Sequence, residues 1–254
     1  MNSVLKVNKN LSILKHGIPV CLVFPGFSVG LSFLGYDLTL GASAWSWKIG
    51  ILVIFFSCLI MIGTYIKDQG NNSLLAHGIM ELVVSFAFYY LFGSMYFYFF
   101  IFAPMHPWIR LLGIAWGGCL SLYWFVISYR NGMRAINSTE LINKAFYEYP
   151  ENIVFYVKEY GKEANKSYKF RNPIPKFYLY IIYALCPTPM VAFIITKALS
   201  NYSFGTDAIL IVIAALGLPM SLGFIEFLVR AYLIQIVLAL RLEKERHKPV
   251  LIDD

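Results

Sequence analysis

Two charged side chains lie one helical turn apart inside a long apolar run of the sequence. Glu226 and Arg230 interrupt the run from Ala208 to Leu242, in the stretch GFIEFLVRAY. The i, i+4 spacing puts both on one face of a helix, where they can pair. Pairing lowers the cost of holding a charge in the bilayer centre, which is about 2.5–3.5 kcal/mol for a single residue. The pair is therefore tolerable in lipid and is a candidate functional group.

A second carboxylate, Glu81, lies near the start of another apolar stretch, and His77 precedes it by one turn on the same helical face. If the two helices face each other, Glu81, Glu226, Arg230 and His77 form one polar cluster. Two carboxylates around one arginine leave a surplus negative charge that could bind a proton or a cation. Two other interpretations stay open: a clamp that fixes helix packing, and unrelated charges that reach interfacial water.

The familiar catalytic motifs are missing from this sequence. It has no GxSxG, no HExxH and no Gly-rich phosphate-binding loop. The cysteines show neither CxxC nor metal-ligand spacing, and we expect all four to pack as small apolar side chains: Cys21, Cys58, Cys119 and Cys186. We therefore predict no catalytic residues, no metal and no cofactor.

The elements that must position the cluster are membrane helices. The composition is 59% hydrophobic and only 14% charged, against roughly a quarter charged in a soluble domain. Several almost uncharged stretches of about 20 residues are long enough to cross a hydrocarbon layer of ~30 Å, and backbone groups in lipid favour helices. We predict an all-α, polytopic membrane bundle with six spans, at 17–36, 46–66, 76–103, 108–129, 177–199 and 208–229.

The basic residues predict the orientation of these spans. Of the 21 lysines and arginines, all but Lys48, Arg110 and Lys197 fall in segments on one side. The positive-inside rule then puts both termini in the cytoplasm. The expected organisation is a cytoplasmic N-terminus (1–16), four spans in two hairpins (17–129), a cytoplasmic basic and aromatic segment (130–176), two spans (177–229), and a helical extension with a basic cytoplasmic tail (230–254).

Prolines predict breaks in three of the spans. The expected break positions are Pro19, Pro25, Pro187, Pro189 and Pro219. Carbonyl groups freed at a break can line a cavity or hold an ion, or neighbouring helices can absorb the kink without a ligand. The first span has three interpretations: a kinked transmembrane helix, a re-entrant element, or the core of a signal peptide cleaved near Ala44.

The segment 130–176 is the one stretch with room for structure outside the membrane. Asn137-Ser-Thr-Glu140 predicts a helix start, and Pro150 could begin a second helix that Gly161 ends. Residues 153–159, IVFYVKE, would alternatively form a strand. The interleaved aromatic and basic residues suit either an anionic lipid or partner surface, or the ordinary composition of a loop beside the membrane.

These observations favour a membrane protein that acts by binding another protein, in immunity, exclusion or defence, or as an accessory subunit of a secretion or transport machine. The alternative is a small transporter or channel that uses the Glu/Arg cluster, and the third choice is a membrane-embedded enzyme. The net charge is +7, but the sequence has no nucleic-acid-binding motif, so we expect no nucleic-acid partner. We expect the partners to be the lipid bilayer and a membrane protein or a second copy of the chain. Short loops favour a bacterial inner membrane as the plasma membrane concerned.

Overall fold

The computed structural model describes residues 9–41, 43–137, 139–161 and 208–253, and these are mostly helical. The long helices are α1 (Lys9–Ser32), α2 (Trp45–Asp68), α3 (Leu74–Phe102), α4 (Pro107–Ile136) and α9 (Ala208–Arg230). α1 continues into a π-helix, η1 (Phe33–Thr39), and α9 continues into η2 (Ala231–Leu238) and then α10 (Ala239–Arg246). The short elements are α5 (Thr139–Ala145) and the strands β1 (Phe146–Glu148), β2 (Ile153–Tyr156) and β3 (Val250–Asp253).

Five helical segments in the described residues are long and apolar enough to cross a membrane. They cover the expected stretches 17–36, 46–66, 76–103, 108–129 and 208–229, so the helical prediction is confirmed at these five places. The expected span 177–199, with Pro187 and Pro189, lies outside the described residues.

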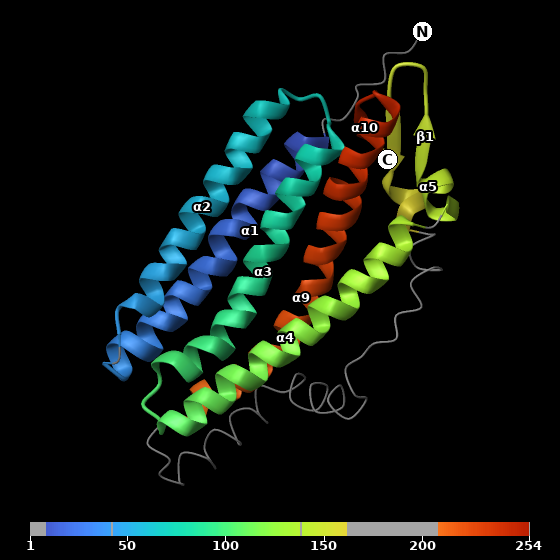
Figure 1. Cartoon of the computed structure of the whole chain (residues 1–254). Coiled ribbons are helices and arrows are strands. Elements are labelled where there is room, and N and C mark those ends of the chain that lie inside the picture. Colours follow the sequence, from blue (N-terminus) through green and yellow to red (C-terminus); the bar gives the residue numbers. More distant parts are fainter. Residues whose placement is uncertain (1–8, 42, 138, 162–207, 254) are drawn as a thin grey trace.

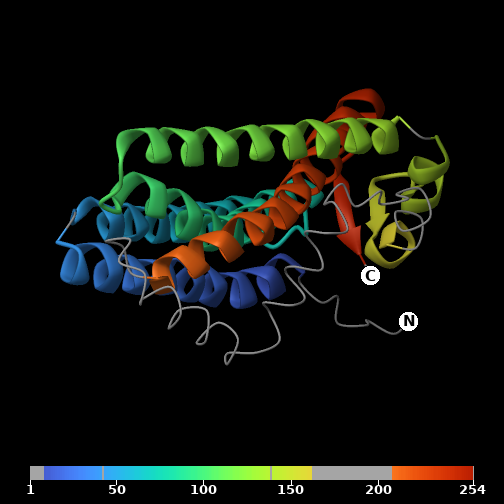
Figure 2. The same ribbon diagram turned by 90° about the horizontal axis from the view of Figure 1, so that it is seen from below.

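α3 lies at the centre of the bundle and contacts α1, α2, α4, α9 and η2. α1 and α2 form an adjacent pair on one flank of α3, and α4 lies on the other flank (Figures 1 and 2). α3 and α9 run in opposite directions, because Gly78 of α3 lies against Gln235 whereas Gly93 lies against Ser221. The central helix pair thus carries both halves of the expected polar cluster.

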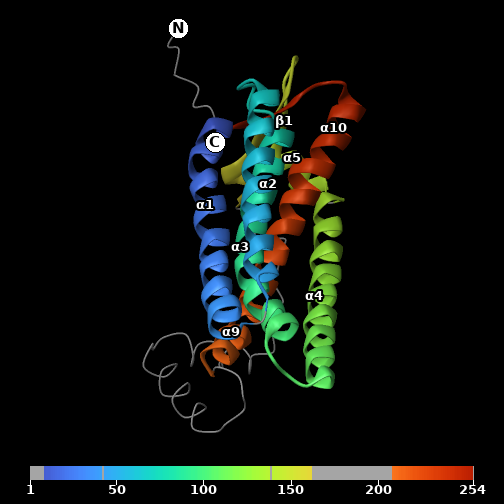
Figure 3. The same ribbon diagram turned by 90° about the vertical axis from the view of Figure 1, so that its left-hand side faces the viewer.

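The expected tight hairpin of α3 and α4 holds only near their shared connection. There the Tyr96 hydroxyl donates a hydrogen bond to the Gly113 carbonyl, at 2.8 Å. Toward its other end α4 leaves α3, and Gly132 packs against Leu233 of η2 instead (Figure 3). This divergence leaves space between α4 and the central helices.

The expected helix breaks are wrong at the three prolines that the structure describes. Pro19 and Pro25 lie inside α1, and Pro219 lies inside α9. Of the three interpretations of the first span, the described residues fit a single long helix and not a re-entrant element. Neighbouring helices pack closely on this part of α1, since Gly17 lies against Met61 and Val84 and Pro25 is fully buried.

A small sheet lies at the end of the bundle where α1 begins. β1 pairs antiparallel with β2, and β2 pairs parallel with β3 in the register Ile153↔Val250. β3 also meets the connection between α2 and α3, where the Ile252 amide donates to the Asn72 carbonyl at 2.9 Å. We call this end of the bundle, with β1, β2, β3 and the connection between α2 and α3, the cap. Residues 247–253, which we expected to lie in a basic tail, are therefore part of the cap.

The sequence signals in 130–176 are partly realised. α4 extends to Ile136, which places Arg130 and Arg134 in a helix and not in a loop. α5 begins at Thr139, as the Asn137-Ser-Thr-Glu140 pattern predicts. Both alternatives for residues 153–159 occur in sequence, because β2 ends at Tyr156 and a helical turn follows to Gly161.

Candidate functional site

Glu81 of α3 lies against η2, where the Gln235 side-chain amide donates a hydrogen bond to Glu81 Oε2. The two helices approach closely because residue 78 is a glycine. A Cβ at position 78 would lie 2.7 Å from the Cβ of Gln235. Because Gly78 of α3 faces Gln235 of η2, the Gln235 amide lies next to the Glu81 carboxylate.

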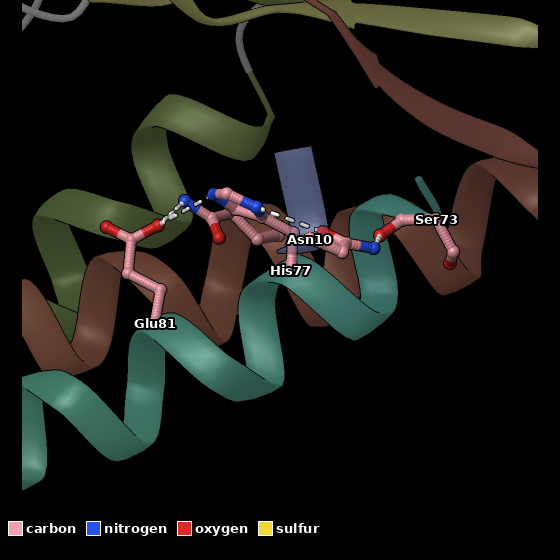
Figure 4. A network of polar contacts seen from close by, with 5 residues as sticks. Asn10, Ser73, His77 and Glu81 are labelled. Atoms are coloured by element: carbon pink, nitrogen blue, oxygen red, sulfur yellow. Dashed lines mark hydrogen bonds and ion pairs between the residues drawn. The ribbon is translucent and has the colours of Figure 1, made fainter. Parts of the chain in front are cut away.

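His77 connects Glu81 to α1. Its Nε2 lies 3.9 Å from Glu81 Oε2, and its Nδ1 lies 3.2 Å from Oδ1 of Asn10 (Figure 4). Asn10 has no exposed surface. An asparagine buried this way requires hydrogen-bond partners, because an unpaired buried amide is costly.

Asp68 at the end of α2 is a further hydrogen-bond partner of Asn10. Asn10 Nδ2 donates to Asp68 Oδ2 at 2.8 Å and to the Ser73 carbonyl at 3.2 Å. The second carboxylate oxygen of Asp68 accepts from the Ser73 amide at 3.2 Å. We call the series Asp68, Asn10, His77, Glu81 and Gln235 the polar chain, and it links α2, α1, α3 and η2.

Glu226 and Arg230 form the ion pair that their spacing predicts. The Arg230 guanidinium donates to Glu226 Oε1 at 3.2 Å, and both side chains are about three-quarters buried. Of the four residues of the expected cluster, the structure brings Glu226 together with Arg230 and His77 together with Glu81. One cluster that joins the two pairs stays a prediction.

Sequence reasoning missed three members of the polar chain: Asn10, Asp68 and Gln235. Gln235 gave a signal, because it interrupts the apolar run after Arg230. Asn10 and Asp68 gave none, since their contacts join residues about 60 positions apart. Their role follows only from the packing of α1 against the connection between α2 and α3.

The polar chain can do two things chemically. Its hydrogen bonds hold four helical elements together, as a clamp would. It can also accept a proton at the Glu81 carboxylate, because 36% of that side chain is exposed. Next to this carboxylate, the Gln235 Oε1 is a buried acceptor without a hydrogen-bond partner among the described residues. Within the same residues no group of three or more His, Cys, Asp or Glu side chains is arranged to hold a metal ion.

A groove opens where α4 leaves α3. It has a volume of about 660 Å³ and runs between α4 and α9, with α3 as its floor. We call it the α4–α9 groove. Its walls are apolar apart from hydroxyl groups, and they include Tyr89, Ser121, Leu122, Phe125, Ile225 and Val229.

The cap has its own charged contact outside the helices. Lys248 Nζ lies 2.7 Å from Glu148 Oε1 and also donates to the Tyr149 carbonyl at 2.9 Å. The hydrogen bond from Lys248 and the lysine charge hold the pKa of Glu148 below its ordinary value. This contact ties β1 to Lys248, two residues before β3.

Comparison of the chain with models of protein families, with curated proteins and with solved structures finds no match.

Proposed function

We propose that this chain is a six-span membrane protein of a bacterial inner membrane, with the cap in the cytoplasm. Charged residues at both ends of two helices support this placement. Lys48 and Lys67 are separated along α2 by a rise of about 29 Å, and Arg110 and Arg130 along α4 by about 30 Å. Both intervals match the ~30 Å thickness of a bilayer core.

The distribution of basic residues supports the orientation. Among the described residues, the end that carries the cap holds most of the lysines and arginines, whereas the opposite end holds Lys48 and Arg110. The positive-inside rule puts the cap in the cytoplasm. The described chain reaches Gly161 at the cap and resumes at Ala208 at the opposite end (Figure 1), which is the arrangement that six crossings require.

If Lys67 and Arg130 mark the cytoplasmic boundary of the bilayer, the polar chain lies at its cytoplasmic surface. Gly78 is level with Gln235, and Gly132 is level with Leu233. Arg130, which marks the membrane boundary on α4, is then within about one turn of the level of Glu81. His77 and Gln235 lie at or beyond this boundary, and Glu226 lies about one turn inside it.

We further propose that the protein acts by binding an apolar helix of another membrane protein in the α4–α9 groove. The groove is the observation that carries this proposal. Helix-in-groove recognition needs an apolar channel with few polar groups, and the lining of this groove is apolar apart from a few hydroxyls. Hydroxyls such as those of Tyr89 and Ser121 can hydrogen-bond across helices in lipid.

A photo-crosslinking amino acid at Leu122 tests this function in native membranes. We expect a crosslink to one distinct protein that co-purifies with the chain. The matched control is the same amino acid at Trp116, which is exposed on α4 but does not line the groove, and it should give no such product. Crosslinks from Leu122 only to lipid or within the chain would reject a partner in the groove.

The second candidate, a small transporter, is favoured by the Glu226–Arg230 ion pair inside an apolar helix. Intramembrane ion pairs often mark substrate or proton paths. Uptake of solutes into vesicles that contain the purified chain tests it. Transport that is lost in both Glu81→Gln and Glu226→Gln, with both variants folded, would support this candidate over the first.

A further inference from the structure

A second cavity, beside the Asp68 end of the polar chain, is amphipathic. It has a volume of about 300 Å³ and lies between the end of α2, the start of α3 and β3. Its polar lining includes Thr64, Lys67 and Asn71, and its apolar lining includes Leu75, Ile79 and Leu251. The cavity is separate from the α4–α9 groove, with which it shares no lining residue.

The charged residues that line this cavity are Lys67 and Asp68, of which Lys67 is the more accessible to a ligand. Lys67 is exposed and forms no ion pair with any described residue. The neighbouring carboxylate of Asp68 is turned inward, since its two oxygens accept hydrogen bonds from Asn10 and the Ser73 amide. Asp68 is only 7% exposed. The lysine ammonium is thus the accessible charge in the cavity.

The position of the cavity is that of a lipid head group. Lys67 marks the cytoplasmic boundary of the bilayer on α2, by the spacing from Lys48 given above. Thr64 lies one turn nearer the membrane centre, and Ile79 continues the apolar wall of the cavity on α3. A ligand must therefore place an anionic group beside Lys67 and an apolar group beside Ile79.

We propose that this cavity binds an anionic phospholipid, with its phosphate at Lys67 and the start of an acyl chain along Ile79. Asn71 and Thr64 are the hydrogen-bonding groups for the phosphate and glycerol oxygens. Anionic lipids of the cytoplasmic leaflet attract basic residues near the surface, by about 1 kcal/mol for each lysine. The proposal rests on the membrane placement above and not on a protein partner.

Photolabelling tests the site on the full chain in nanodiscs of phosphatidylcholine. The probe is a phosphatidylglycerol analogue with a diazirine near the top of one acyl chain. We expect labelling of peptides that contain residues 64–79, and a several-fold loss of this labelling in Lys67→Gln. The matched control, Lys15→Gln, changes an exposed lysine of α1 outside the cavity and should leave the labelling unchanged.

Competition separates the ligand from its alternatives. Unlabelled phosphatidylglycerol should displace the probe, whereas extra phosphatidylcholine and millimolar inorganic phosphate should not. Equal displacement by inorganic phosphate would overturn the lipid proposal in favour of a free anion site. Equal labelling of the parent and Lys67→Gln would overturn the site itself. Neither result depends on a crosslink from Leu122, so failure of the groove proposal is seen separately.

Discussion

On the membrane placement proposed above, the contact between Glu81 and Gln235 lies where lipid head groups meet the hydrocarbon. At this depth a charged carboxylate can keep contact with water, and Glu81 does so through its exposed third. Gln235 is buried. Its side-chain NH2 group donates a hydrogen bond to Glu81, while its Oε1 has no hydrogen-bond partner among the described residues. The hydrogen bond should therefore contribute less than one between fully satisfied groups.

Replacing Gln235 by Leu tests this view of the residue. We expect the free energy of unfolding in mixed detergent micelles to fall by about 1 kcal/mol, because a net hydrogen bond to a charged group is lost while an unmatched acceptor is also removed. Glu81→Ala in the parent and in Gln235→Leu completes a double-mutant cycle. A coupling energy of zero would mean that the two side chains do not act together.

Glu148 gives a prediction about pH. Its pKa in the folded protein is depressed, so its contact with Lys248 contributes stability above the unfolded-state pKa and loses it as the pH falls through the folded value. Hydrogen exchange of the β3 amides, corrected for intrinsic rates, should show constant protection at neutral pH and a decrease below the ordinary value of 4.5. In Glu148→Gln we expect weaker protection at neutral pH and no decrease over that acidic range. A decrease of equal size in this variant would assign the acid sensitivity to another group.

The sequence predicts contacts within one helix well and contacts between distant segments poorly. The i, i+4 rule finds Glu226 with Arg230 because helix geometry alone brings them together. The contact of Asn10 with Asp68 depends on how α1 packs against the end of α2. No local pattern carries that information, so Asn10 and Asp68 come only from the structure.

At the scale of elements, small residues decide how closely helices approach. Prolines were expected to break helices, yet Pro19, Pro25 and Pro219 lie within continuous ones, since a proline removes one hydrogen bond that neighbouring groups in a bundle can compensate. Gly78 and Gly132 instead mark where α3 and α4 meet η2. The long apolar runs predicted the helices, but the crossing points depend on these glycines.

A pair of glycine substitutions tests the close approach of α3 and η2. Gly78→Ala brings a methyl group within 2.7 Å of the Gln235 Cβ and 3.1 Å of its backbone carbon, so we expect unfolding to become easier by about 1–3 kcal/mol. The control is Gly63→Ala on α2, where a Cβ meets nothing within 4 Å. It should be neutral or stabilising by about 0.4–1 kcal/mol. Equal effects of the two changes would contradict the proposed packing.

The whole molecule has two unlike ends. The cap end brings together the start of α1, the connection between α2 and α3, and all three strands (Figure 1). The opposite end consists of the connections after η1 and after α3, with the aromatic residues Trp45, Trp47 and Trp108 near them. Few cations are typical of an outward-facing end, whereas tryptophans are enriched at both surfaces of a membrane.

Single cysteines test this polarity in intact cells. In a chain with all four native cysteines replaced, a membrane-impermeant maleimide should label a cysteine at His106 and should label one at Asn71 only after the membrane is opened. Both positions are exposed, so the reagent reaches each side chain when it reaches that side. The reverse pattern would show that the cap faces outward, opposite to the proposed orientation. Labelling of both positions in intact cells would reject the membrane placement.

The parallel pairing of β2 with β3 joins residues that leave the ribosome far apart in time. β3 follows every other described element, so Ile153 and Phe155 have no strand beside them on that edge until Val250–Asp253 has been synthesised. Until then Phe155, which is 1% exposed in the finished fold, lacks its neighbour Ile252 in β3. The cap therefore forms only after Val250–Asp253 has been synthesised, which makes it the last part of the described fold to be completed.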